Sequence, residues 1–126
     1  MANAVVTKVG RQKMLKARAG DISLPKITKM AFGSGGVGSG GTVIEPTTEQ
    51  TSLNNELMRK AVDGHAYMSD TVCRYTCTLL PEELAGKSIS ELGLVDEEDD
   101  IIAIKNFSAK GKDSDLEMTF NIDDSF

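Results

Sequence analysis

The stretch that decides the fold is ISELGLVDEEDDIIAIKNF, residues 89–107. It holds two apolar runs, Ile89 to Val95 and Ile101 to Phe107, with five consecutive acidic residues between them. Two short apolar runs joined by a polar turn are typical of a β-hairpin. Because five adjacent carboxylates cannot be buried together, we expect residues 96–100 to form a charged tip that keeps a sheet edge soluble.

Further strands are predicted on both sides of this hairpin. Residues 116–123 alternate apolar and polar side chains, which is the pattern of a strand with one buried face. Residues 71–80 alternate in the same way and stop at Pro81, and residues 26–32 form another candidate strand. Strands that do not alternate regularly with helices predict an α+β domain with a mainly antiparallel sheet or a small sandwich.

One helix is predicted, and we expect it to pack on this sheet. Thr7 is a suitable N-cap, and the helix then runs from Lys8 to Ala19 and ends near Gly20. Gly10 is a weak helix former, so we expect it at a point of close packing.

Residues 47–62 are open to two interpretations. Five apolar residues have helical spacing, but Glu56 to Tyr67 also fits a strand with a bend at Asp63-Gly64. We favour a short helix near 48–55 that runs into a strand. A helical turn is also predicted over Pro81-Glu82-Glu83-Leu84, because proline and carboxylates are favoured at helix starts.

Six of the twelve glycines fall within residues 33–41. We expect a long flexible loop over about residues 33–46, outside the core. Gly33-x-Gly35-x-x-Gly38 matches the spacing of the dinucleotide-binding motif, but residues 42–46 cannot open the helix that receives a pyrophosphate. A solvated or partner-ordered loop is therefore favoured over a nucleotide site.

The length and the charge distribution of the chain limit the kinds of function that it can have. The 126 residues suit a single domain, residues 1–126. Residues 1–30 carry seven Lys/Arg and one Asp, a net charge of +6, whereas residues 80–126 carry a net charge of −9. This polarity argues against a uniformly basic nucleic-acid binder. With aromatics at 5 % and no Trp, base or sugar stacking is disfavoured too.

The chain shows no apolar run long enough for a signal peptide or a membrane span. We therefore expect a soluble protein made in a cytoplasm, with no membrane insertion. Cys73 and Cys77 would lie about 13 Å apart on one face of a strand, beyond the roughly 7 Å of a disulfide. We expect both in the core, because a zinc site would need more ligands than His65 adds.

No residue is assigned to a catalytic, cofactor or metal site. His65 lies in a polar bend, where an exposed histidine is the simpler interpretation. Glu82 and Glu83 are explained by capping a turn rather than by acid–base catalysis. The acidic turn lacks the glycine and the spacing of a helix–loop–helix calcium site. The sequence therefore indicates a structural or interaction role and no enzyme.

Several segments, in this order, resemble the N-terminal domain of bacteriophage tail-collar fibre proteins. The most specific is the hairpin, with Ile89-Ser90-Glu91-Leu92-Gly93-Leu94-Val95-Asp96 followed by the second apolar run. Upstream matches are Thr7-x-x-Gly10-Arg11, the segment Ile27 to Gly35, and Leu53-Asn54-Asn55-Glu56-Leu57-Met58-Arg59.

The resemblance implies a virion structural protein of a phage or prophage tail, which anchors a fibre to the baseplate without catalysis and forms a homo-oligomer, usually a trimer. It also implies close backbone approach at Gly93, and Glu91 either pairs with Arg59 or caps backbone groups. Two features depart from the family. The chain stops at Phe126, where such fibres continue into a shaft, and Asp99-Asp100 replaces an Asp-Gly turn.

Two alternatives remain: a surface glycan-binding module, and a small nucleotide-dependent protein that uses residues 33–41. For an assembling subunit, we expect the basic first helix to meet the acidic surface of a neighbouring copy or of a baseplate protein. Reversal of Lys13, Lys16 and Arg18 would test this expectation.

Overall fold

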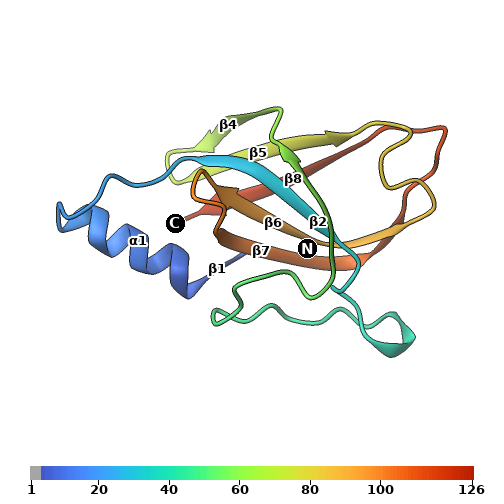
Figure 1. Cartoon of the computed structure of the whole chain (residues 1–126), viewed down its shortest axis with the longest axis horizontal. Coiled ribbons are helices and arrows are strands. Elements are labelled where there is room, and N and C mark those ends of the chain that lie inside the picture. The colour runs from blue at the N-terminus through green and yellow to red at the C-terminus, as the bar shows by residue number, and fades with distance from the viewer. Residues whose placement is uncertain (1–3) are drawn as a thin grey trace.

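The predicted hairpin lies at the centre of the larger of two sheets (Figure 1). The computed structural model describes residues 4–126. Gly93 pairs with Ile104 across the hairpin, and every neighbouring pair in this sheet is antiparallel. The sheet has the order β1-β7-β6-β2-β3, with β1 Val5–Val6, β2 Ile27–Gly33, β3 Glu56–Ala61, β6 Ser88–Asp96 and β7 Ile101–Gly111.

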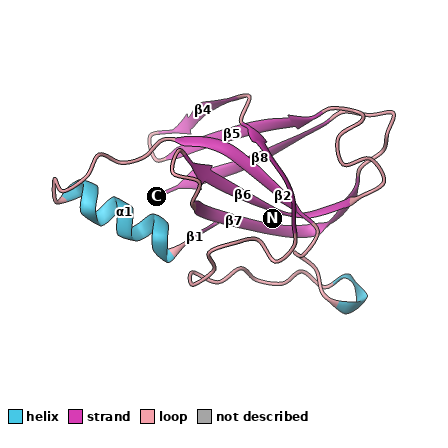
Figure 2. Ribbon diagram, in the orientation of Figure 1, coloured by secondary structure: helices cyan, strands magenta, loops and turns pink. Residues whose placement is uncertain are grey.

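A second antiparallel sheet of three strands faces the first (Figure 2). Its order is β4-β5-β8, with β4 Gly64–Ser69, β5 Val72–Leu79 and β8 Met118–Ser125. Cys77 pairs with Phe120 and Leu79 with Met118, so the apolar residues of β5 and β8 share one face. Leu116, predicted to begin the last strand, precedes it and is exposed.

The main core lies between the two sheets. Phe32 of β2 meets Phe120 of β8 with ring centroids 5.4 Å apart at 71°, the edge-to-face geometry that aromatic pairs favour. The broad α+β class is thus confirmed, in the form of a small sandwich with one α-helix in the described chain. The buried members of the cluster are Met30, Phe32, Cys77, Leu79, Ile89, Leu92, Leu94, Ala103, Phe120 and Ile122.

The chain closes one side of the sandwich by passing directly from β3 to β4. The Val62 N–H donates to Thr28 of the larger sheet, whereas the Asp63 N–H donates to Thr76 of the smaller sheet. The predicted bend at Asp63-Gly64 is thus the corner at which the chain changes sheets. Lys60 strengthens this corner, because its Nζ donates to the Thr78 carbonyl at 2.7 Å.

The helix α1, Lys8–Arg18, begins against the edge of β7. The predicted cap is confirmed: Thr7 Oγ1 accepts from the Gly10 N–H at 3.1 Å and donates to the Ile101 carbonyl at 2.8 Å. A Cβ on Gly10 would lie 2.9 Å from Ile102, so the absence of a side chain lets the helix approach the strand. The close packing expected at Gly10 is confirmed.

Two predicted helical segments are wrong. Residues 47–55 form turns and bends, because Leu53 is buried against the outer face of the larger sheet while the next two backbone N–H groups donate to Glu91 of β6. Residues 81–86 form consecutive turns, and Leu84 has φ 51°, which no α-helix tolerates. The strand alternative for residues 56–67 is the correct one, although the chain divides it between two sheets.

The glycine-rich segment is not a long loop outside the core. Gly33 completes β2, and Gly36 is buried with its N–H donating to Ser90 Oγ at 2.9 Å. A Cβ on Gly36 would lie 2.0 Å from the Ser90 carbonyl, so glycine is required for this approach. Further along, Val37 bridges to Val43 around a 3₁₀ turn, Ser39–Gly41. Five of the six glycines therefore serve close packing at one end or positive φ at the tip, rather than flexibility alone.

Candidate functional site

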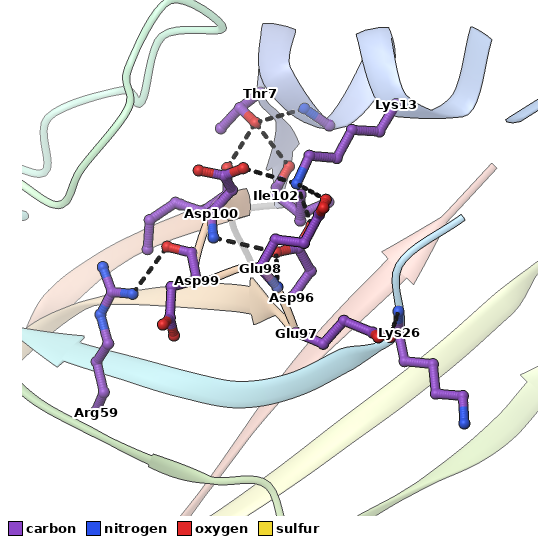
Figure 3. Close-up of polar contacts among 12 residues, drawn as sticks. Thr7, Lys13, Lys26, Arg59, Asp96, Glu97, Glu98, Asp99, Asp100 and Ile102 are labelled. Atoms are coloured by element: carbon purple, nitrogen blue, oxygen red, sulfur yellow. Dashed lines mark hydrogen bonds and ion pairs between the residues drawn. The ribbon is translucent and has the colours of Figure 1, made fainter. Parts of the chain in front are cut away.

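The acidic hairpin tip is clamped by a lysine from helix α1 (Figure 3). Lys13 Nζ lies 2.6 Å from Asp96, 2.9 Å from Glu98 and 2.7 Å from Asp100. The three carboxylates lie close enough together to hold a metal ion, but the lysine ammonium stands among them. The helix thus supplies the positive charge that the tip requires.

The backbone of the tip is also fixed from several directions. Asp96 is buried, and its Oδ1 accepts from the N–H groups of Glu98 and Asp100. Glu97 accepts from the Lys26 N–H, and the Asp99 carbonyl accepts from Arg59 at 3.1 Å. The left-handed conformation falls on Asp99, with φ 66°, and not on Asp100, so the second position of this Asp99-Asp100 turn does not require the family's glycine. The expected free tip is therefore a partly buried joint between α1 and the sheet.

Charge pairing at this joint raises the pKa of Lys13. Burial alone would lower it, but hydrogen bonds to Asp100, Asp96 and Glu98 outweigh burial. Lys13 therefore stays charged at every ordinary pH. Of the three helix residues expected to meet a neighbouring copy, Lys13 is instead engaged within the chain, while Lys16 and Arg18 are exposed.

Glu91, on the central strand β6 five residues before Asp96, forms a second polar joint. Its carboxylate is fully buried and accepts from the N–H groups of Asn54, Asn55 and Gly35 at 2.7–2.9 Å. Glu91 thus caps backbone groups, and Arg59 pairs with Glu56 instead. This arrangement explains the ordered pair of segments, Gly33–Gly35 and Leu53–Glu56, that the sequence resemblance singled out. At Gly93 the neighbours are side chains rather than the expected backbone, since a Cβ there would lie 3.2 Å from Ile101 Cδ1 and 3.3 Å from Leu53 Cδ2.

The remaining candidates from the sequence are dispersed. His65 lies on β4, all of whose residues are exposed, next to Tyr67 with ring centroids 5.8 Å apart. Glu83 accepts from the Leu80 N–H and from Lys60, so it stabilises a turn as expected, although the turn is not helical. Cys77 is buried, Cys73 is partly buried, and neither forms a disulfide. Burial raises the pKa of the Cys77 thiol to about 11.

The surface has two clefts that the sequence analysis did not predict. The larger is a cleft of about 830 Å³ on the side of the sandwich away from the β3–β4 corner, between β7 and β8. The smaller, of about 430 Å³, lies between α1 and the end of β8 and is lined by Arg11, Met14, Leu15 and Phe126 among others. Neither has a local sequence signal, because each depends on strands distant in the chain.

The sequence model of the phage tail-collar fibre proteins, N-terminal part, matches residues 1–121. The chain belongs to this family. The family indicates a structural role in a phage tail, and the resemblance carried by the hairpin and the Thr7, Ile27 and Leu53 segments is confirmed. Searches of characterised proteins and of solved structures returned no match.

The only α-helix in the described chain, α1, has eleven residues and is too short and polar to cross a membrane.

Proposed function

We propose that this tail-collar fibre domain attaches a fibre to the baseplate end of a phage or prophage tail by protein–protein assembly, without catalysis. The family match over nearly the whole chain carries the proposal. The arrangement of polar groups supports it: the acidic residues of the hairpin tip and Glu91 are engaged in joints that hold loops and helix together. Such joints make a rigid body with fixed surfaces, as an anchoring part requires.

The domain is further proposed to act as a homo-oligomer, with a trimer expected from the family. Lys16 and Arg18 remain exposed on α1, and the exposed Glu117 and Asp115 lie near the start of β8. Contact between these surfaces of adjacent copies would be head-to-tail, which closes into a ring when the rotation allows it. Synthesis in the host cytoplasm followed by incorporation into the tail completes this proposal.

Incorporation into the particle tests the attachment role. Tails are purified from a producing strain and from a strain that lacks the coding sequence, and their proteins are identified by mass spectrometry. We expect the protein in intact tails, and fibres missing from particles made without it. Complete, fibre-bearing tails without the protein would contradict the proposal.

The oligomer is tested separately in solution. The variant K16E/R18E should lower the mass measured by light scattering at low salt, because surface charge pairs are screened weakly there. The matched control K87E/K110E changes two exposed lysines outside α1 and should keep the wild-type mass. An unchanged mass for K16E/R18E would remove α1 from the interface.

A second candidate function, glycan binding, has one observation in its favour. Tyr67 is 77 % exposed on β4 and lies edge-on to His65, which together form a small aromatic surface. A glycan array probed with the wild-type protein and with Tyr67→Ala would show binding that depends on this side chain.

A further inference from the structure

The two sheets differ in width on the side where β7 and β8 lie. The larger sheet continues from β6 to β7 and β1, whereas the smaller sheet ends at β8, which contacts β6 across the sandwich. The inner face of β7 thus has no strand opposite it in the described chain. The cleft of about 830 Å³ occupies this place.

The cleft has an apolar floor. Leu92 is buried at its base, and Phe107 and Phe120 lie with ring centroids 6.3 Å apart. Phe107 is only partly buried, although it shares a face of β7 with Ala103 of the main core. Apolar side chains of an added segment would complete the burial of this face.

Both walls of the cleft offer unpaired strand edges. Within residues 4–126, β8 pairs with β5 alone, so its other edge has a row of backbone N–H and C=O groups without a strand partner along Met118–Ser125. In the same described part of the chain, the pairing of β7 with β1 covers Ala103 and Ile104. An exposed edge of this kind is a template on which an extended peptide can add as a further strand.

The charged groups of the cleft indicate the chemistry of the segment. Lys105 faces the cleft from the inner side of β7, and Lys110 lies at its end; within residues 4–126 neither forms an ion pair. Asp123 is already bonded to Arg74 at 2.8 Å, which leaves Glu45 as the unpaired acid of the lining. The free positive charge therefore favours acidic side chains.

We propose that the cleft between β7 and β8 binds an extended segment of another tail protein as a fourth strand beside β8, with both apolar and acidic side chains on the face that it turns toward β7. The apolar side chains pack on Leu92 and Phe107, and the acidic ones reach Lys105 and Lys110. About six residues cover the lined part of β8, a length of roughly 20 Å. That the partner is a tail protein rests on the proposed attachment function.

A display library of randomised nine-residue peptides tests the chemistry. Selection on the wild-type domain should enrich peptides in which apolar and acidic residues share every second position, so that they lie on one face of the strand. Selection on K105E/K110E should enrich basic ones, with the acidic peptides bound about tenfold or more weakly because like charges then face each other. The control K16E/K87E, with both changes outside the cleft, should select as wild type does. Equal enrichment on wild type and K105E/K110E, or none on either, would overturn the proposal.

Strand addition is tested with a synthetic copy of the best wild-type peptide. By NMR, every second backbone amide of β8 should exchange more slowly with solvent when the peptide is bound, since alternate N–H groups of an edge strand point outward. Protection on β4 instead, or none on β8, would overturn the proposal. Because these measurements use the isolated domain, their failure leaves the incorporation of the protein into tails as a separate result.

Discussion

The two sides of the sandwich are built differently. At the β3–β4 corner the chain itself joins the sheets, and Lys60 donates to both Thr78 and Glu83 across the junction. Between β7 and β8 the chain crosses at one end, through residues 112–117, and Lys105 and Phe107 along β7 are left partly exposed. The side at the β3–β4 corner thus satisfies its lysine within the chain, whereas the side at β7 and β8 leaves Lys105 and Phe107 incompletely packed.

This difference separates stability from assembly. A side that is complete should be sensitive to substitution and insensitive to partners, and an incomplete side should behave in the opposite way. The predictions below compare matched residues on the two sides.

The largest difference is expected for apolar truncations. Leu79 is fully buried at the closed side, so Leu79→Ala should lower the free energy of unfolding by about 2–5 kcal/mol. Met118, its partner in β8, is only partly buried, so Met118→Ala should cost less than half as much. Urea denaturation followed by circular dichroism measures both values. Equal losses would mean that the cleft side is as well packed as the corner.

Replacement of the two lysines should give a smaller difference. Lys60→Met removes two hydrogen bonds at the corner and should cost about 1–2 kcal/mol. Lys105→Met should change the free energy of unfolding by under about 0.5 kcal/mol, because no bond within the described residues is lost. A larger loss for Lys105→Met would show that Lys105 has a structural role.

The pH dependence of the corner should be smaller still. Backbone bonding from Leu80, and then pairing with Lys60, holds the pKa of Glu83 below its ordinary value of 4.5. Its charged form therefore stabilises the fold above that pH, and this contribution is lost as the pH falls through the lowered pKa. In melting curves from pH 7 to pH 3, Glu83→Gln should lose less stability on acidification than wild type. Parallel curves would assign the acid sensitivity to other carboxylates.

Thiol reactivity compares two positions on β5, one inside the closed side and one beside the exposed strand β4, without altering stability. Cys77 lies inside the closed side, burial raises its pKa to about 11, and its Sγ is 3.4 Å from the Ala61 carbonyl. Cys73 is only partly buried nearer the exposed strand β4. Iodoacetamide at pH 8 should therefore label Cys73 well before Cys77, as mass spectrometry of the digested protein would show. Equal labelling rates would indicate that the corner opens easily.

The strands were the predictable part of the fold. Residues 71–80 and 116–123 alternate strictly, and the hairpin has two apolar runs. In each case the pattern within the segment itself shows which side chains are buried. The 3.6-residue spacing in residues 47–62 was misleading, because Leu53 and Leu57 are buried against different parts of the molecule. Local spacing cannot reveal that one segment divides between two sheets.

The polar joints were only partly predictable. The acidic residues 96–100 suggested a tip exposed to solvent. In the structure Lys13, 83 residues before Asp96, pairs with these carboxylates and so connects the tip to α1. The glycines between residues 33 and 36 suggested flexibility. The buried Glu91 and Ser90 that hold them come from a strand distant in the chain, so the local sequence could not show that this segment is fixed. The cleft had no sequence signal, since it results from two sheets of unequal width.

The order of β5 and β8 has a mechanical consequence. The Phe126 N–H donates to the Thr71 carbonyl, and β8 runs antiparallel to β5 over its whole length. A pull on Phe126 along the strand axis would act on all the cross-strand hydrogen bonds at once, in shear, rather than peel them apart one by one. A load transmitted through the last strand of this domain would thus act in the direction in which the β5–β8 hydrogen bonds resist force best.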